Sequence, residues 1–595
     1  MTSQYAIGID LGTTNSVVAF TPLDVDSPEI NLLDIKQWVA VGQTEMRTSL
    51  PSFLYLPLDN ESSALASLDS GGGPGVVGEL ARQKAADAPG RVVAAAKSWL
   101  CHQRVNRQDA ILPWQTPDPI TKVSPVTASR RYLEHLVAQW NTVHPHAPFA
   151  EQLVVLTVPA SFDPAARELT REAALAAGLP IDFVMLEEPQ AAVYRYLAAR
   201  GELWRKDLKR DDRLLVVDVG GGTTDLTLVS VAEINGNLEL RRSAVGNHLL
   251  VGGDNMDLAL AHYVAQKLQQ QGHTLDPWQS VSLWHSCRMA KESLLSGLNI
   301  ERQSISVLGR GSRLIGGSIA TELTREEVTR HLIDGFLPIV EAQERPQPQW
   351  ASGFQDIGLP YESDPAITRH LAAFLISQQD DTGVWPTHLL LNGGVFRSTS
   401  LRERLCEVIR RWSGDRELKL LSGPADLDHA VAQGAAYYGW SKRRGGVRIR
   451  GGTARSYYIG IEVAGLAIPG AARPLRALCV APRGMEEGSE VNVPSGEVGL
   501  VIGQPARFRF FASSTRKDDA AGTLLGHWQP DELVETHPVE VTLATHVELK
   551  DPFVPVRFHS RVTELGIFEL WCRSVRDEQQ WKLDFNVRDD NGGSE

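Results

Sequence analysis

Short apolar strands alternate with helical stretches over most of the chain, and one strand pattern occurs twice. Residues 7–19 (IGIDLGTTNSVVA) and 215–229 (LVVDVGGGTTDLTLV) each place an apolar strand before Asp, Gly and paired Thr, followed by a second alternating strand. This pattern predicts a β-hairpin in each segment. Later alternating runs, such as 506–512 and 539–545, are separated by turn residues. We therefore expect an α/β region followed by a mostly-β region.

The main compositional break lies at residues 441–452 (SKRRGGVRIRGG), where a helical pattern stops and a basic, Gly-rich stretch begins. We expect the principal linker there. The runs GGGPG (71–75) and RPQPQ (345–349) are typical of surface insertions within a domain.

Both predicted hairpins suit phosphate binding. Turn glycines allow close backbone approach, and successive backbone amides form an anion-binding concavity. The hydroxyl donors are Thr13, Thr14, Thr223 and Thr224. A single such motif is equally often a plain Gly-rich turn, but its duplication favours two hairpins that hold phosphates from both sides.

Carboxylates stand at the strand ends beside these glycines. Asp10 and Asp218 could hold a hydrated magnesium ion next to phosphates, and Asp225 could do likewise or order water. Between the hairpins, Glu187 and Glu188 leave a strand just before Pro189. They could position a water molecule or, as the commoner alternative, only favour the start of a helix electrostatically.

A third Gly-rich element follows at residues 389–405 (LLLNGGVFRSTSLRERL). Gly393 and Gly394 lie between an apolar strand and a helix, so that a flat nucleoside could lie against the backbone. The same arrangement is ordinary α/β turn chemistry, but its position after two phosphate hairpins favours nucleoside contact.

Composition excludes several other classes. The formal net charge of -13 opposes binding to nucleic acid. No apolar run approaches the ~18 residues of a membrane span, and residues 1–12 lack a signal-like pattern, so we expect a cytoplasmic protein. The five cysteines form no CxxC pair, which argues against a disulfide framework and against structural zinc.

Seven segments, in order, resemble the nucleotide-binding domain of the seventy-kilodalton heat-shock chaperones. They are IGIDLGTTNS, TVPASFD, EEPQAA, VVDVGGGTTD, VGGDNMD, LNGGVF and DHAVAQGAA, and the resemblance covers about residues 5–440. It implies a two-lobed actin-like ATPase with a duplicated ribonuclease-H-like core, followed by a small mostly-β domain. The expected units are lobe I (1–210), lobe II (211–423), a closing helix (424–442), a linker (443–454) and a β-rich, substrate-binding-like domain without a helical lid (455–595).

The resemblance also implies roles for individual residues. Glu188 would order water, with Asp218, Thr223 and Arg82 also catalytic, and Pro159 and Arg167 would form an interdomain switch pair. Asp10, Asp218 and Asp225 would hold Mg²⁺, with Asp428 near the metal. The nucleotide-binding residues would be Gly12, Thr13, Thr14, Asn15, Gly220, Gly221, Gly222, Thr223, Gly252, Gly253, Asp254, Arg288, Lys291, Gly393, Gly394 and Arg397.

The chain departs from the family at two places in this set. Arg82 stands where we align the phosphate-contacting lysine of the family, which keeps the charge but not the compact ammonium. Arg288 and Glu292 have exchanged charges relative to the family, and they could rebuild the nucleoside contact or form a surface i,i+4 pair.

The resemblance therefore predicts an ATP-dependent chaperone-like protein with ATP or ADP and Mg²⁺ as cofactors and with client proteins or peptides and co-chaperones as partners. The alternatives are a nucleotide-binding scaffold without efficient turnover and a small-molecule kinase of the actin-like fold. The basic linker, 443–454, predicts docking onto the ATPase through acidic residues rather than through apolar area.

Overall fold

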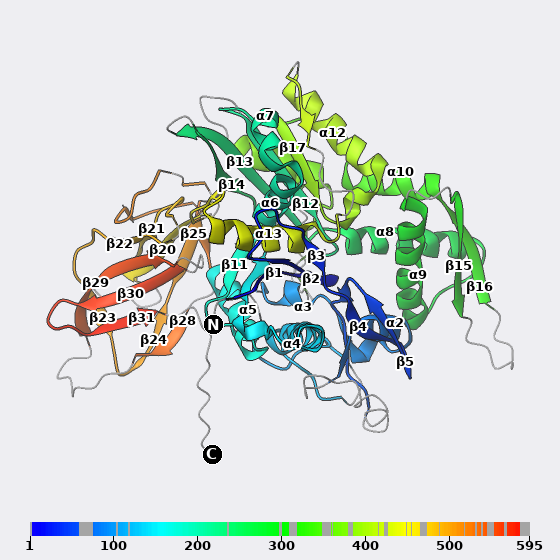
Figure 1. Ribbon diagram of the computed structural model, residues 1–595, viewed down its shortest axis with the longest axis horizontal. Helices are drawn as coiled ribbons and strands as arrows, with labels where there is room; N and C mark the ends of the chain where they lie inside the picture. Colours follow the sequence, from blue (N-terminus) through cyan, green and yellow to red (C-terminus); the bar gives the residue numbers. More distant parts are fainter. Residues whose placement is uncertain are drawn as a thin grey trace.

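The computed structural model describes residues 3–58, 75–102, 105–116, 120–234, 237–296, 300–308, 318–347, 359, 361–378, 385–414, 416–421, 427–447, 449–453, 455–463, 473–486, 488–513, 515–516, 518–529, 532–536, 539–543, 553–563 and 568–583. Figure 1 shows two α/β units, one above the other, with a β-rich unit beside them.

The first sheet is built around the first predicted hairpin. β1 (Tyr5–Leu11) and β2 (Asn15–Pro22) pair antiparallel. β10 (Leu153–Val158) lies parallel to β1, and β11 (Val184–Glu187) lies parallel to β10. The short strands β3 (Asn31–Leu32) and β6 (Leu50–Pro51) pair with β2. We call this sheet, with the elements packed on its outer face, lobe I.

The second sheet repeats this arrangement around the second predicted hairpin. β12 (Arg213–Val219) and β13 (Thr224–Ile234) pair antiparallel, and β17 (His388–Asn392) and β18 (Lys419–Leu420) extend the sheet in parallel from β12. β14 (Asn237–Val245) pairs with β13 on the other side. Both predicted hairpins are thereby confirmed. We call this sheet, with the elements packed on its outer face, lobe II.

Two helices lie between the sheets, α6 (Glu188–Arg200) and α13 (Ala430–Arg444), as Figure 1 shows. They approach closely because small residues face each other: a Cβ atom on Gly434 would collide with the carbonyl group of Ala191. On the other side of α13, a Cβ atom on Gly8 of β1 would collide with the backbone of Ala436. Close packing of this kind joins the two lobes at their base.

The remaining helices and strands of the two lobes cover the outer faces of the sheets and the mouth between them. In lobe I these are β4 (Ile35–Ala40), β5 (Gln43–Arg47), β7 (Leu54–Tyr55), β8 (Val76–Val77), α2 (Glu79–Asp87), β9 (Val92–Val93), α3 (Ala96–Trp99), α4 (Pro125–Val143) and α5 (Pro164–Ala176). Between the lobes in sequence lies α7 (Trp204–Asp207). In lobe II they are α8 (Gly253–Gln270), α9 (Pro277–Leu295), β15 (Arg302–Leu308), β16 (Ser318–Thr324), α10 (Arg325–Phe336), α11 (Ile367–Ser377) and α12 (Thr399–Ser413).

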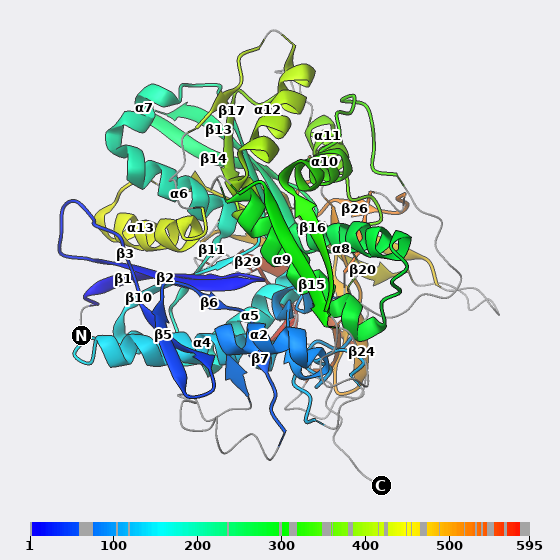
Figure 2. The ribbon, with the colours of Figure 1, turned by 90° about the vertical axis from the view of Figure 1, so that its right-hand side faces the viewer.

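Local sequence explains where key helices begin. α5 starts at Pro164 after Asp163, whose side chain accepts a hydrogen bond from the amide of Ala166, as the sequence predicts. α10 starts with a capping box, in which Thr324 and Glu327 satisfy each other's backbone amides. Across the mouth of the cleft, α2 of lobe I contacts α9 of lobe II, and Figure 2 shows the two helices near each other.

The C-terminal region is a β-sandwich in its described residues. One sheet has the order β26-β21-β20-β25-β27, and the other has β22-β29-β30-β31 with β23 beside β29. Ile459 and Leu478 of the first sheet share one core with Val554 and Leu570 of the second. Among residues 455–583, the described part contains no helix. The strands are β20 (Ser456–Glu462), β21 (Leu475–Ala481), β22 (Glu490–Asn492), β23 (Val498–Val501), β24 (Pro505–Phe508), β25 (Phe510–Ser513), β26 (Leu524–Leu525), β27 (Val534–Glu535), β28 (Val539–Thr542), β29 (Phe553–Val562), β30 (Phe568–Ser574) and β31 (Gln580–Leu583).

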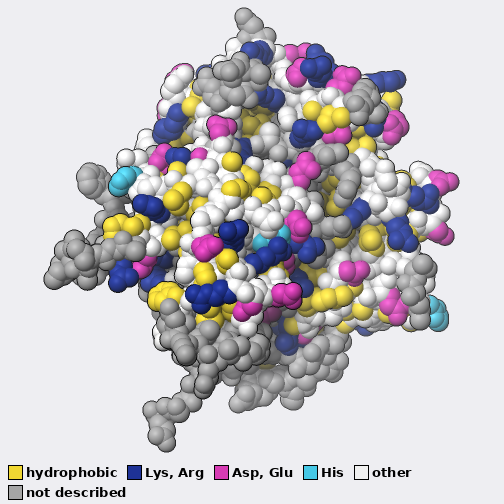
Figure 3. Space-filling view, turned by 90° about the vertical axis from the view of Figure 1, so that its left-hand side faces the viewer, with side chains coloured by type: hydrophobic (Ala, Val, Ile, Leu, Met, Phe, Trp, Pro, Cys, Tyr) yellow, Lys and Arg dark blue, Asp and Glu magenta, His cyan; other side chains and the backbone are white. Residues whose placement is uncertain are grey.

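The face of the molecule that carries this β-sandwich mixes side chains of every kind. Figure 3 shows hydrophobic, basic and acidic side chains interspersed over it. An interspersed surface of this kind gives no basis for choosing a peptide groove, so we assign no peptide-binding residues.

The linker differs from the prediction in two respects. The basic residues up to Arg444 continue α13 instead of beginning the linker, because Lys and Arg favour the last turn of a helix, and Gly445 then ends it with φ 68°. β19 (Ile449–Arg450) next pairs in parallel with β14 of lobe II. Ile449 is only 7% exposed and packs among apolar residues, so the expectation of docking through charge rather than apolar area is wrong for this residue.

Within the described part of the chain, none of the helices combines the length and the apolar character that a membrane crossing requires.

Candidate functional site

A cleft of about 660 Å³ lies between the two hairpins, a size typical of a small-molecule site. The hairpins face each other closely: a Cβ atom on Gly221 of lobe II would collide with the side chain of Thr14 of lobe I, and one on Gly222 would lie 2.9 Å from Cγ2 of Thr13. Both turns therefore need glycine where they meet.

Most of the residues that the sequence selects line this cleft. They are Asp10, Gly12, Thr13, Thr14, Asn15, Arg82, Glu188, Asp218, Gly220, Gly221, Thr223, Asp225, Gly253, Asp254, Arg288, Lys291, Gly393, Gly394, Arg397 and Asp428. Gly222 and Gly252 are not among the lining residues, although Gly222 packs against Thr13 and Gly252 against Gly221. Thr224, selected as a hydroxyl donor, is instead fully buried and donates its hydroxyl hydrogen to the carbonyl oxygen of Val251.

Lys97, which the sequence did not indicate, lies among the carboxylates of the cleft. Its ammonium group is paired with Glu188, and both side chains are about nine-tenths buried. Lys97 is the second residue of α3 (Ala96–Trp99), and the other three residues of this helix are buried. A lysine within an apolar stretch is the signal that could have indicated it, since a buried ammonium requires a partner.

The carboxylates outnumber this single ammonium group. Burial raises the pKa of Asp218 to about 7 and that of Glu188 to about 8, and the neighbouring carboxylates add to both shifts. Burial also raises the pKa of Asp10, although Lys97 opposes the shift. Burial lowers the pKa of Lys97, but Glu188 and Asp10 outweigh it, so that Lys97 stays charged. The centre of the cleft therefore has more buried carboxyl groups than Lys97 can neutralise, and raised pKa values show that Asp10, Asp218 and Glu188 hold protons more readily than usual.

Hydrogen bonds fix these carboxylates in place. Asn392 of β17 donates to Asp218 over 2.7 Å, and Thr157 of β10 donates to Asp10 over 3.4 Å. Burial raises the pKa of Asp225, but His248, Ser161 and Lys97 outweigh burial and lower it. Asp225 therefore remains an ionised carboxylate beside groups that hold protons more readily.

Arg82 lies at the rim of the cleft and not at its centre. Its guanidinium group donates to Glu79 over 3.0 Å, and 39% of its side chain is exposed. Glu79 also pairs with Arg47 over 2.9 Å. Lys97 is therefore the more deeply buried of these two cations that line the cleft.

The two adjacent glutamates point to different places. Glu188 faces Lys97 in the cleft. Glu187 faces away and accepts hydrogen bonds from Arg167 of α5, over 2.9 Å, and from Arg242 of β14. The side chain of Glu187 is 9% exposed, so it forms a buried bridge between the two lobes.

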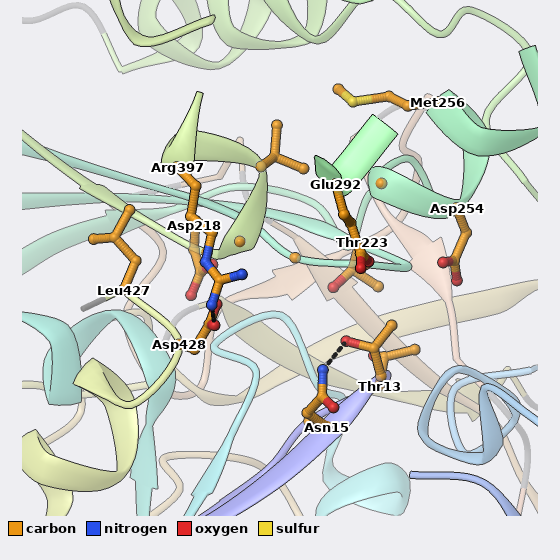
Figure 4. A pocket seen from close by; sticks show the side chains of 18 of the residues that line it. Thr13, Asn15, Asp218, Thr223, Asp254, Met256, Glu292, Arg397, Leu427 and Asp428 are labelled. Atoms are coloured by element: carbon orange, nitrogen blue, oxygen red, sulfur yellow. Dashed lines mark hydrogen bonds and ion pairs between the residues drawn. The ribbon is translucent and has the colours of Figure 1, made fainter. Parts of the chain in front are cut away.

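The far end of the cleft is lined by α8 and α9 on one side and by the Gly-rich turn after β17 on the other. Figure 4 shows Asp254, Met256 and Glu292 on one side of the pocket and Arg397 with Asp428 on the opposite side. Arg397 and Asp428 form an ion pair. Gly393 has φ 89°, and a Cβ atom there would lie 2.7 Å from an oxygen of Asp218, so glycine is required.

Arg288 does not pair with Glu292, which was one of two possibilities from the sequence. It donates to Asp257 over 2.8 Å and also to Asp254. Lys291 pairs with Asp257 over 2.7 Å and donates to the carbonyl oxygen of Gly253 over 3.1 Å. Arg288 and Lys291 therefore hold the start of α8 against α9.

The donor set fits magnesium held through water and phosphate. The described residues contain no group of three or more His, Cys, Asp or Glu side chains arranged to hold a metal ion by themselves. Mg²⁺ in nucleotide sites usually keeps several waters and takes only one or two protein carboxylates. An excess of buried carboxylates without a preformed cage agrees with that mode of binding.

Comparisons with known proteins agree with this geometry. The family model described as Hsp70 protein matches residues 121–342. The Chaperone protein HscA homolog of Shewanella frigidimarina is 28% identical over 315 residues, which are 50% of this chain and 43% of that protein. The Chaperone protein DnaK of Mesomycoplasma hyopneumoniae is 26% identical over 425 residues, which are 69% of this chain and 60% of that protein.

The match thus spans roughly half the length of these curated relatives, at low identity. The family model, the two chaperone relatives and the paired hairpins around one cleft agree: the chain is similar to Hsp70 proteins, and the family model itself matches residues 121–342.

Proposed function

We propose that the chain binds ATP with Mg²⁺ in the cleft, hydrolyses it to ADP and phosphate, and uses the exchange to control protein or peptide binding by the β-sandwich. The observation that carries the proposal is the meeting of two glycine-rich hairpins, from different lobes, around Lys97 and an excess of buried carboxylates. A ligand that touches both hairpins would hold the lobes together. ATP and ADP differ by one phosphate group, so they would favour different arrangements of the two lobes.

The phosphates would lie between the two turns. Backbone amides of both turns and the hydroxyls of Thr13 and Thr223 would donate to them. Lys97 would neutralise part of their charge, since its ammonium group is buried nearby. Mg²⁺, when bound, would supply further charge neutralisation, held by Asp10, Asp218 and Asp225 through water.

Glu188 is the residue we assign to water positioning. Its carboxyl pKa of about 8 reflects burial among other carboxylates, and Lys97 holds its orientation. A carboxylate so placed can orient a water molecule or accept its proton. Phosphoryl transfer depends mainly on positioning and charge stabilisation, which this arrangement supplies.

The nucleoside would lie at the far end of the cleft. The backbone at Gly393 and Gly394 leaves room for a flat base, and Arg397 is well placed to stack on it. Glu292 lines this end and has no ion pair within the described part of the chain. We therefore propose Glu292 as an acceptor for a hydroxyl or N–H group of the nucleoside.

The relatives named chaperones suggest the biological setting. We propose client proteins or peptides and co-chaperones as partners of the chain and the cytoplasm as its location. β19 precedes the β-sandwich in the chain and pairs with β14 of lobe II, so that nucleotide state could reach the β-sandwich through this contact.

A phosphate-release assay tests the proposal. Purified protein with Mg²⁺ and ATP should release phosphate, and an unfolded peptide should raise the rate. Release without any peptide effect would leave an ATPase that is not coupled to protein binding. Release only with an added sugar would indicate a kinase, and nucleotide binding without release would indicate a scaffold.

A further inference from the structure

One hydrogen bond joins the lobes directly beside the carboxylates of the cleft. Ser161 lies in lobe I, in the turn between β10 and α5, and is 8% exposed. Its hydroxyl group donates to Oδ1 of Asp225 over 2.6 Å. Asp225 belongs to β13 of lobe II and is 3% exposed. The contact therefore crosses from one lobe to the other in a buried position.

His248 completes this contact from lobe II. Its Nδ1 atom lies 2.7 Å from the Ser161 hydroxyl oxygen. A serine hydroxyl has one hydrogen, and Ser161 gives it to Asp225, so Nδ1 of His248 must carry a hydrogen and donate to Ser161. The backbone next to His248 is tied to the same strand, because the amide of Thr224 donates to the carbonyl oxygen of Leu249 over 2.9 Å.

Ser161 thus holds two parts of lobe II from the opposite lobe. One is the carboxylate of Asp225, and the other is the loop from His248 towards the start of α8. Among the described residues, Ser161 occupies Oδ1 of Asp225, and no hydrogen bond occupies Oδ2. Since Asp225 lines the cleft, Oδ2 is the oxygen left for a ligand there.

We propose that Ser161 is a positioning residue: its hydroxyl, supplied by lobe I, fixes the rotation of the Asp225 carboxylate in lobe II, so that Oδ2 is aligned towards the magnesium nucleotide only when the lobes are closed. The proposal rests on the proposed function of the cleft. It makes lobe closure and carboxylate alignment a single event, because neither partner of the hydrogen bond can form it alone.

Three variants of the full chain test the proposal. Ser161→Ala removes the hydroxyl, and Ser161→Thr keeps it. Ser129→Ala is the matched control, because Ser129 is also a buried serine of lobe I, but its hydroxyl donates to the carbonyl oxygen of Pro125 within α4. All three changes alter a buried hydroxyl site in lobe I, and only the first should affect Asp225.

The first measurement is calorimetric titration of ADP at a series of Mg²⁺ concentrations. Ser161→Ala should need about tenfold more Mg²⁺ for half of the full effect on affinity, with affinity in EDTA unchanged, because a misaligned carboxylate weakens only the magnesium-dependent part. Ser161→Thr and Ser129→Ala should lie within about twofold of the wild type. An unchanged Mg²⁺ requirement in Ser161→Ala, or an equal loss in Ser161→Thr, overturns the proposal.

The second measurement is hydrogen exchange of the protein without nucleotide, so that it does not depend on the proposed function. Ser161→Ala should speed exchange both in residues 159–163 of lobe I and in residues 247–250 of lobe II. Acceleration confined to residues 159–163 would show a local structural role and contradict the bridge. If the wild type shows no magnesium-dependent nucleotide binding, the proposed function fails, while this second measurement still decides whether Ser161 joins the lobes.

Discussion

Gly252 and Gly253 are neighbours at the start of α8, yet the structure predicts opposite results when each is replaced by alanine. A Cβ atom on Gly252 would lie 2.7 Å from the carbonyl oxygen of Gly221, 2.8 Å from that of Gly220 and 2.9 Å from the amide nitrogen of Thr223. All three are backbone atoms of the second phosphate hairpin. The φ angle of Gly252 is -169°, an extended conformation open to any residue, so the obstacle is space alone.

The second hairpin cannot move aside without loss. The amide of Gly253 donates to Gly220 over 3.0 Å, and the amide of Asp254 donates to Gly221 over 2.7 Å. Moving these carbonyl groups by the several tenths of an ångström that a methyl group needs would weaken both hydrogen bonds. Overpacking costs about 1–3 kcal/mol and each weakened hydrogen bond up to about 1 kcal/mol. These costs together come to about 3 kcal/mol. If half of this free energy is lost from nucleotide binding, the affinity for the nucleotide falls by about tenfold.

Gly253 is the matched control. A Cβ atom there would lie 3.4 Å from the flexible end of Lys291 and 3.6 Å from the nearest backbone atom, which are ordinary contact distances. We expect Gly253→Ala to bind ADP with Mg²⁺ within about twofold of the wild type and Gly252→Ala to bind it at least about tenfold more weakly, both measured by calorimetry. Equal affinities for the two variants, with both folded by circular dichroism, would refute the placement of the second hairpin against the nucleotide.

Three further predictions follow from buried contacts. Glu188→Ala should retain ATP binding and lose most phosphate release, because this side chain faces the cleft. Glu187→Ala should keep phosphate release and expose the linker to protease, because Glu187 instead bridges the lobes through Arg167 and Arg242. Equal release rates in the two variants would contradict the assignment. Burial raises the pKa of Glu327, but hydrogen bonds outweigh it and lower the pKa to about 2, so the carboxylate stabilises the fold above its usual pKa of 4.5. Glu327→Gln should therefore destabilise by about 1 kcal/mol at pH 7, a difference that shrinks as pH falls from about 4.5 towards 2 in urea titrations; a pH-independent difference would count against it. Gly434→Ala should lower stability by about 1–3 kcal/mol in the same titrations, since the methyl group meets the carbonyl of Ala191, and an unchanged midpoint would show that α6 and α13 pack less closely than described.

The sequence was most informative where local chemistry decides the structure. The Asp-Gly-Thr pattern indicated both hairpins because a hairpin is determined by its own turn glycines and by the alternating strands on either side of the turn. Asp163 and Pro164 indicated the start of α5 for the same reason. These features need no knowledge of distant residues.

Tertiary contacts decided features that local sequence patterns do not indicate. Lys97 reaches Glu188 from 91 positions away, and Arg82, chosen by alignment with the family, has Glu79 as a partner one helical turn away. Thr224 resembles Thr223 in sequence, but the strand period turns its hydroxyl inward to Val251. Arg288 had a plausible partner on its own helix and instead pairs with two aspartates of α8.

The linker shows how the two kinds of information combine. Its basic residues suggested docking through acidic residues, and Arg444, which ends α13, does pair with Asp26 over 2.5 Å. The docking itself uses backbone pairing of Ile449 with Leu240 and a hydrogen bond from the amide of Ile449 to the hydroxyl of Tyr194 over 2.8 Å. Ile449 and the partly buried Val447 suffice as apolar contacts because an edge strand of lobe II supplies the hydrogen-bond partners.

Hydrogen exchange of the full chain, measured with Mg²⁺ and ATP, with Mg²⁺ and ADP, and without nucleotide, shows directly whether a nucleotide binds between the lobes. We expect both nucleotides to slow exchange in residues 10–15 of lobe I and residues 218–225 of lobe II together, because the ligand would lie between the two hairpins. We also expect exchange at residues 445–453 to differ between ATP and ADP. Protection of only one hairpin, or of neither, would contradict the placement of the nucleotide between the lobes.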